Sequence, residues 1–139
     1  MITHYPAIIQ KECNSWMVRF PDFEHISTFG GALEDAIIAA GEALNGCLES
    51  DFERGFDFPE PSVYDGDHVY LIPLEPNIAL ALELRKARAG RPQVEVAREL
   101  GISYQAYQRL EHPAKSNPTV KTLAKIAKVL GKSLEIRLI

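Results

Sequence analysis

The sequence predicts an α+β protein of two domains, residues 1–76 and 77–139, and three observations lead to this prediction. Apolar and polar residues alternate along residues 15–20, which is the period of a β-strand with one buried face. Apolar residues recur at helical spacing along residues 32–54 and in several shorter segments of the second domain. The formal charge also changes sign near Pro76.

The first domain is expected to start with a β-hairpin whose strands are residues 3–10 and 15–20. Pro6 has no amide hydrogen, so the first strand should have a free edge or a bulge at that point. Residues 26–29 are expected to add a short third strand, and residues 68–74 a last one.

A long helix is expected between the third and last strands, over residues 32–54. Glu34 and Asp35 lie in its first turn, where negative charge favours the helix dipole. The order of these elements indicates a small α+β layer with the helix covering one face of the sheet. The apolar stripe that should face the sheet consists of Leu33, Ile37, Ala40, Leu44, Cys47 and Leu48.

The second domain is predicted to be all-α up to a short C-terminal strand, with a helix-turn-helix motif over residues 93–111. Gly101 can take the positive φ of a sharp turn between two short helices, and Ser103 can cap the second one. The side chains expected to face inward are Val94, Ala97, Leu100, Tyr107 and Leu110.

The second helix of this motif leaves Tyr104, Gln105, Gln108 and Arg109 facing outward. In a helix-turn-helix, this helix enters the major groove of DNA. Amide and guanidinium side chains suit that position, because each can make two hydrogen bonds to an adenine or guanine edge. The alternative is an ordinary helical hairpin with a solvated polar face.

The end of the chain is predicted to form a last helix and then the short strand. Asn117 is expected to cap the helix, with Pro118 at its first position. Residues 132–139 alternate apolar and polar side chains, as a strand does. Since a lone exposed strand invites aggregation, we expect it to pair with the same segment of a second subunit or with an edge of the N-terminal sheet.

The formal net charge of −4 conceals a division between the two domains. Residues 1–76 contain three basic and fourteen acidic residues, a net charge of −11, whereas the remainder contains twelve basic and five acidic residues, a net charge of +7. A basic domain attracts polyanions, and an acidic domain favours a basic protein. The alternative for the acidic domain is a solvated surface kept for solubility.

The sequence offers little support for an enzyme, a metal site or a membrane protein. The four histidines are scattered without the spacing of a triad or a metal site, so we expect no catalytic residue, no metal and no cofactor. Cys13 and Cys47 do not make a disulfide framework. The longest near-apolar run, residues 78–84, is too short to cross a bilayer, and the N-terminus lacks the pattern of a signal peptide. We therefore expect a cytoplasmic protein that does not bind membranes.

Residues 78–131 resemble the lambda-repressor-like (XRE, Cro/C1) helix-turn-helix family. Two departures are Pro92, where the family usually caps its second helix with Ser or Thr, and a loop that opens with His112 and Pro113 in place of the usual glycine. The matching segments are Gln93-x-x-Val96-Ala97, Leu100-Gly101-Ile102-Ser103, Leu110-Glu111, Asn117-Pro118-Thr119 and Leu123-x-x-Ile126-Ala127-x-x-Leu130-Gly131.

This resemblance implies binding to double-stranded operator DNA, with Tyr104, Gln105, Gln108 and Arg109 at the positions that face base edges. Gln93 matches a phosphate contact at a helix start. Such a small module is expected to bind a two-fold operator as a dimer. Further candidates for phosphate contacts are Ser103, Lys115 and Ser116.

Residues 2–74 resemble the N-terminal domain of HicB-type antitoxins. The resemblance implies a partial ribonuclease-H-like fold without working catalysis, and binding to a small, basic, RNA-cleaving HicA toxin. Gly31 departs mildly from the family, which often has Asp as the helix cap there. The matching segments are Tyr5-Pro6-Ala7, Trp16-x-Val18-x-Phe20-Pro21-Asp22-Phe23, Thr28-Phe29-Gly30, Leu33-Glu34-Asp35-Ala36, Glu42-Ala43-Leu44 and Phe58-Pro59-x-Pro61-Ser62.

The whole sequence therefore indicates an antitoxin of a type II toxin–antitoxin system, which neutralises a HicA-type toxin, represses its own operon and forms a homodimer or a higher oligomer such as a dimer of dimers. The alternative is a stand-alone helix-turn-helix transcriptional regulator whose first domain binds a ligand or only oligomerises. Candidate toxin contacts are the acidic residues of the helix face and loops: Asp22, Glu24, Glu34, Asp35, Glu42 and Glu49.

Overall fold

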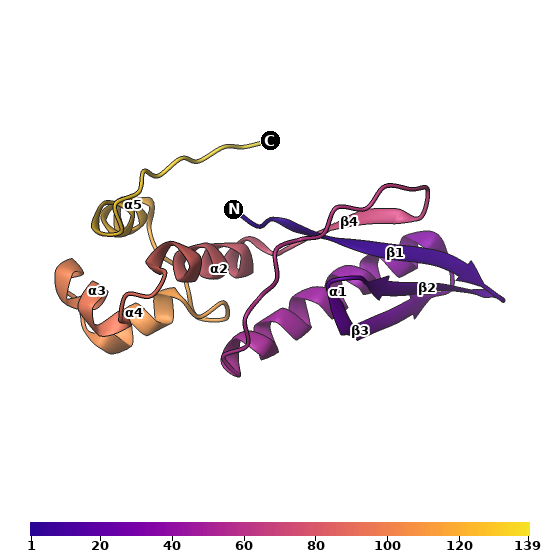
Figure 1. The fold of residues 1–139 in the computed structure, drawn as a ribbon, viewed down its shortest axis with the longest axis horizontal. Helices are drawn as coiled ribbons and strands as arrows, with labels where there is room; N and C mark the ends of the chain where they lie inside the picture. The colour runs from indigo at the N-terminus through magenta and orange to yellow at the C-terminus, as the bar shows by residue number, and fades with distance from the viewer. The chain divides into compact units, whose positions relative to one another are not determined.

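The structure is a computed structural model that describes residues 1–139 (Figure 1). It divides into two compact units, Met1–Ala79 and Leu80–Ile139, and the division falls within helix α2 (Pro76–Arg88). The first unit contains a four-stranded sheet and one long helix, and the second contains only helices as regular elements. The predicted α+β class is thus confirmed.

The sheet of the first unit is entirely antiparallel, with strand order β3-β2-β1-β4. The strands are β1 (His4–Glu12), β2 (Ser15–Phe20), β3 (Phe23–Gly30) and β4 (Val69–Pro73). Strand β3 is longer than predicted, because pairing with β2 resumes at Phe23, directly after a two-residue turn. Strand β1 pairs with β2 only from Ile8 onward, so one side of β1 is free at Pro6, as its missing amide hydrogen requires.

Helix α1 (Leu33–Glu53) covers one face of this sheet, as predicted. Its buried line follows an i, i+4 spacing through Ala36, Ala40, Leu44 and Leu48, all fully buried. The prediction is therefore correct for Ala40, Leu44 and Leu48. The other three predicted residues, Leu33, Ile37 and Cys47, lie at the border of the buried face and are half-buried.

A buried amide fixes α1 to the end of β4, a contact that the apolar pattern does not reveal. The Asn45 side-chain nitrogen donates to the carbonyls of Gly41 and Pro73, at 2.9 and 3.2 Å. Its oxygen accepts a 2.8 Å hydrogen bond from the backbone amide of Glu75. All three bonds lie in a part-buried site, where an unpaired amide would be costly. Asn45 thereby holds the end of the sheet against the helix.

The second unit packs around a small core of Val96, Ala97 and Tyr107. Its helices after α2 are α3 (Gln93–Leu100), α4 (Tyr104–Leu110) and α5 (Val120–Val129). The prediction that Val94 faces inward is wrong, because its side chain is 48% exposed. Val96 takes the inward position, since two residues along a helix lie on nearly opposite sides of it.

The start of α5 also differs from the prediction. Thr119, not Asn117, is the N-cap, and its hydroxyl accepts a 3.1 Å hydrogen bond from the amide of Thr122. Both Asn117 and Thr119 are good capping residues by type. Thr119 is the cap because its hydroxyl reaches the amide three residues later, that of Thr122. Pro118, which precedes the cap, therefore lies outside the helix.

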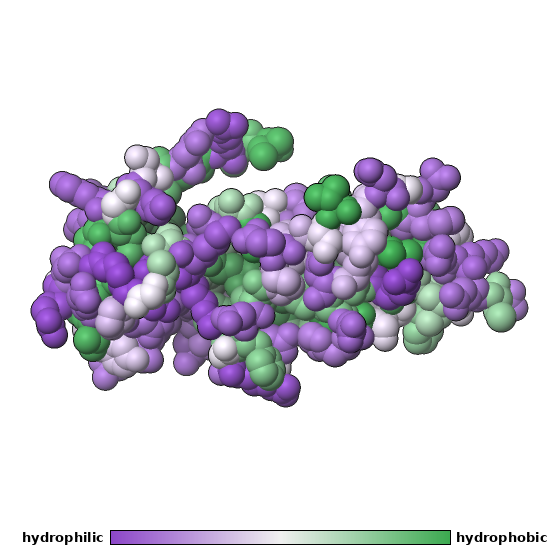
Figure 2. Space-filling view, viewed as in Figure 1, coloured by the Kyte–Doolittle hydropathy of each residue, from purple (hydrophilic) through white to green (hydrophobic).

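The predicted C-terminal strand is absent from the single chain, which corrects the expectation for residues 132–139. This segment follows α5 as extended chain (Figure 1). It makes no ladder hydrogen bonds, and every residue in it is exposed. Hydrophobic atoms are uncovered at its end (Figure 2). A strand exists only when a neighbouring backbone supplies its hydrogen bonds, and none is present here. None of the helices combines the length and the apolar character that a membrane span requires.

Candidate nucleic-acid interface and acidic pocket

The turn between α3 and α4 has the geometry that the sequence predicts. Gly101 is left-handed, with φ of 74°, which a residue with a side chain adopts only at a cost. The amide of Ile102 donates to the carbonyl of Ala97 at 3.1 Å and closes the end of α3. The Ser103 hydroxyl then accepts a 3.1 Å hydrogen bond from the amide of Ala106 and caps α4.

Helix α4 presents one polar face and one buried face. Tyr107 is fully buried in the core of the unit. The four residues predicted to face base edges, Tyr104, Gln105, Gln108 and Arg109, are all exposed. The structure therefore brings two amides, a phenol and a guanidinium to one surface of a helix whose start is fixed by its cap.

The residues predicted to contact phosphates are placed differently from one another. Lys115 is exposed in the loop after α4. The Ser103 hydroxyl uses an acceptor site for its capping bond and keeps its hydrogen for another partner. Gln93, half-buried at the start of α3, donates to the Glu111 carboxylate at 3.2 Å. The Ser116 hydroxyl is buried and has no hydrogen-bond partner, so it does not belong to the exposed surface.

A buried ion pair supports this helix-turn-helix from behind. The Arg88 guanidinium of α2 donates two hydrogen bonds to the carboxylate of Glu111, from Nε at 2.7 Å and from Nη2 at 3.1 Å. Glu111 follows α4 and is only 2% exposed. Arg88 also donates to the carbonyl of Arg91, at 2.7 Å. Burial and the Glu111 carboxylate raise the pKa of the neighbouring Tyr107 hydroxyl. Sequence patterns identified Glu111 only as part of a family segment.

The six acidic residues predicted to contact a toxin do not form one surface. Glu34, Asp35 and Glu42 are exposed on α1, and Glu49 is half-buried on the same helix. Asp22 and Glu24 instead line a pocket at the start of β3. The structure thus separates the candidates into a helical group and a pocket group.

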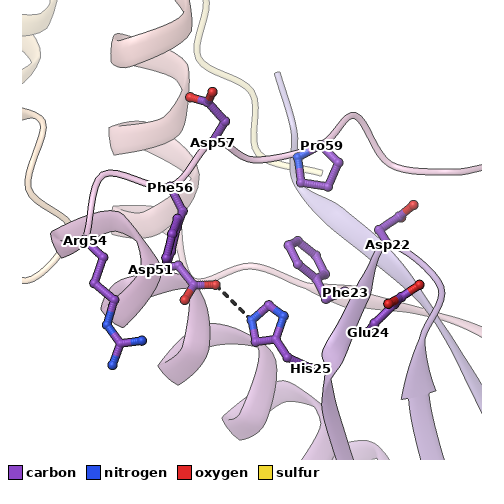
Figure 3. A pocket seen from close by; sticks show the side chains of 9 residues that line it. All are labelled: Asp22, Phe23, Glu24, His25, Asp51, Arg54, Phe56, Asp57 and Pro59. Atoms are coloured by element: carbon purple, nitrogen blue, oxygen red, sulfur yellow. Dashed lines mark hydrogen bonds and ion pairs between the residues drawn. The ribbon is translucent and has the colours of Figure 1, made fainter.

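The pocket has a volume of about 660 Å³ and lies between β3, the end of α1 and the connector that follows it (Figure 3). At its base, His25 Nε2 lies 3.1 Å from Asp51 Oδ2. The sequence signal that could have indicated this pocket is the proline- and phenylalanine-rich connector after α1, residues 56–62. Its lining residues are Asp22, Phe23, Glu24, His25, Asp51, Arg54, Phe56, Asp57 and Pro59.

The connector is tied to the sheet by hydrogen bonds across long sequence separations. The Tyr5 hydroxyl donates to the carbonyl of Pro59 at 2.7 Å. The Asp22 carboxylate accepts hydrogen bonds from the amide of Ser62, at 3.0 Å, and from the Ser62 hydroxyl. Burial and the nearby carboxylates of Asp22 and Glu60 raise the pKa of Tyr5. No group of three or more His, Cys, Asp or Glu side chains is arranged to hold a metal ion.

Comparison with known proteins matches each unit to a separate family. Residues 4–78, more than half of the chain, match the family of HicB-like antitoxins of bacterial toxin–antitoxin systems. The chain belongs to the HicB-like antitoxin family. Residues 82–136 of this HicB-like chain match the helix-turn-helix family, so the antitoxin carries a DNA-binding domain. Both resemblances noted in the sequence are confirmed.

Two named relatives from Photorhabdus laumondii resemble the HicB-like chain over nearly its whole length. Antitoxin HicB 2 is 29% identical over 132 residues, which cover 95% of this chain and 94% of the relative. Antitoxin HicB 1 is 27% identical over 136 residues, which cover 95% of this chain and 84% of the relative. The similarity to these relatives therefore extends over both units of this chain.

Proposed function

We propose that this HicB-like antitoxin neutralises a HicA-type, mRNA-cleaving toxin through its first unit and represses its own operon through its second unit. The observation that carries the proposal is the opposite charge of the two units, −11 in the first and +7 in the second. Electrostatic complementarity favours a basic protein for the first unit and DNA for the second. Both activities belong in the cytoplasm, where mRNA and operator DNA lie.

Neutralisation would be a binding event and not a chemical reaction. HicB-like and helix-turn-helix families are generally non-enzymatic. We therefore infer that the antitoxin inhibits the toxin by binding over its RNA-binding or active face. The direct test is RNA cleavage by the purified toxin encoded beside this chain, measured with increasing amounts of the antitoxin.

Operator binding predicts that Arg109→Ala lowers affinity for the operon's upstream DNA by about 1–3 kcal/mol, because a guanidinium can make two hydrogen bonds to one guanine. The exposure of Arg109 on α4 supports this role. Gel-shift titrations should show relaxed selection at one base pair, whereas equal losses on operator and random DNA would remove Arg109 from the base-reading residues.

Lys115→Ala is the matched variant for phosphate contact, since Lys115 is an exposed cation in the loop after α4. We expect it to weaken binding to every sequence alike and to reduce the salt dependence by about one counterion. The same gel-shift titrations, repeated at several salt concentrations, measure this slope. An unchanged slope would mean that Lys115 does not contact a phosphate.

We also propose that the exposed C-terminal segment pairs with its copy in a second subunit. Leu134, Ile136 and Leu138 occupy alternate positions and are 39%, 59% and 100% exposed. In a strand, alternate side chains lie on the same face, so these three would form an apolar face that nothing covers in the monomer. Deleting residues 134–139 should lower the mass measured by light scattering and weaken binding to a two-fold operator. An unchanged assembly would contradict this pairing.

A further inference from the structure

The pocket of the first unit has apolar walls and a polar base. Figure 3 shows the rings of Phe23 and Phe56 on opposite sides of the hollow, with the His25–Asp51 pair between them. Phe56 is 54% exposed, so much of its ring is open to solvent, whereas Phe23 is only 5% exposed. Phe23 is held in place by an edge contact with Tyr5, with ring centroids 4.7 Å apart. The pocket thus offers the exposed ring of Phe56 beside the buried and fixed ring of Phe23.

The charge of this pocket is predominantly negative. Four carboxylates, those of Asp22, Glu24, Asp51 and Asp57, line it together with a single guanidinium, that of Arg54. The Arg54 side chain extends away from the centre of the hollow (Figure 3). Glu24 is exposed, and its carboxylate has no hydrogen-bond or ion-pair partner. The pocket therefore retains at least one carboxylate that is available to a bound group.

The pocket is also formed before any partner arrives. Its roof is the connector after α1, which the Tyr5–Pro59 and Asp22–Ser62 hydrogen bonds attach to the sheet. Its base is fixed by the His25–Asp51 contact, which joins β3 to the end of α1. A site that is already ordered loses less conformational entropy on binding, and so retains more of its interaction energy.

Aromatic faces combined with carboxylates match the chemistry of arginine. A guanidinium is planar, stacks on aromatic rings and forms paired hydrogen bonds with a carboxylate, whereas lysine is a compact and strongly hydrated point charge. The volume of about 660 Å³ has room for such a side chain together with the backbone that carries it. Burial and neighbouring carboxylates also raise the pKa of Tyr5 beside the pocket, as expected where the potential is negative.

We propose that this pocket receives an arginine side chain of the toxin, with the exposed ring of Phe56 stacking against the guanidinium and Glu24 accepting its hydrogen bonds. This inference rests on the proposed function, because it assigns part of the toxin-binding surface. It also separates the acidic candidates: Glu24 acts by direct contact, whereas Glu34, Asp35 and Glu42 on α1 contribute only to the overall negative field.

The test compares Glu24→Gln with Glu34→Gln in the full chain, titrated calorimetrically with the HicA-type toxin encoded beside it. Each variant removes one exposed negative charge from the same unit, so the long-range field changes equally. We expect Glu24→Gln to weaken binding at least about tenfold more than Glu34→Gln, because a contacting charge pair is lost. Phe56→Ala should also weaken binding about tenfold or more through loss of stacking.

The partner residue is then found by replacing each toxin arginine with alanine in turn. One arginine should couple to Glu24 in a double-mutant cycle, so that the second substitution has little further effect. Equal affinities of the Glu24 and Glu34 variants, or no arginine that couples, would overturn the pocket proposal and leave neutralisation intact. No binding by the wild-type chain would overturn both.

Discussion

Replacing Glu111 with alanine is expected to lower the stability of the second unit by about 3–5 kcal/mol, which is the usual cost of leaving one member of a buried ion pair without its partner. The Arg88 guanidinium is only 15% exposed and would lose both of its hydrogen bonds to the carboxylate. Gln93 would lose its acceptor as well. The variant should therefore loosen the start of α3 and the end of α4 together, and DNA binding should fail with them.

Hydrogen exchange of peptides from residues 93–111 measures this effect in the unit where it occurs. Trp16, the only tryptophan, lies in the first unit, so its fluorescence should remain native. Glu95→Ala is the matched control, because Glu95 pairs with Arg91 in an ion pair whose members are 47% and 33% exposed. That variant should have no measurable effect. Normal protection in the Glu111 variant would show that the ion pair does not hold the motif together.

Replacing Gly30 with alanine is expected to destabilise the first unit by about 3 kcal/mol, at the upper end of the cost of overpacking. A Cβ at this position would lie 2.4 Å from the backbone nitrogen of Ala36 and 2.8 Å from its Cα. These are backbone atoms of α1, which cannot rotate away as a flexible side chain could. The helix and strand β3 would have to separate, which opens the core beneath Ala36.

Gly31→Ala is the control for this substitution, because a Cβ there meets nothing within 4 Å. Urea unfolding followed by Trp16 fluorescence suits the measurement, since Trp16 is paired with Gly30 in the sheet. The Gly31 variant should stay within about 0.5 kcal/mol of the natural chain. Equal stabilities for the two variants would show that α1 does not approach β3 as closely as described.

The features that follow from residue periodicity and turn chemistry could be predicted from the sequence. The order of the strands and the long helix followed from alternation and helical spacing, and the turn at Gly101 and the Ser103 cap followed from conformational preferences. The outward face of α4 followed from the burial of Tyr107 on the opposite side. Each of these features depends on residues that are close to one another in the sequence.

The features that depend on distant residues could not be predicted. Asn45 and Glu111 are polar residues that are buried because partners far along the chain satisfy them. The acidic pocket exists because Asp22 and Tyr5 hold a connector that begins more than thirty residues after Asp22. The C-terminal strand was expected from a correct alternation, but no local pattern supplies the neighbouring backbone that a strand needs.

The inhibition of RNA cleavage by the purified toxin tests the central claim most directly. With increasing amounts of the full antitoxin, RNA cleavage should fall in proportion. It should stop when the antitoxin supplies one binding site for each toxin molecule. The Gly31→Ala variant, which is expected to fold normally, is the control. The same inhibition should persist with Arg109→Ala, because that change affects only the DNA-binding unit. Undiminished cleavage at an excess of folded antitoxin would contradict the account.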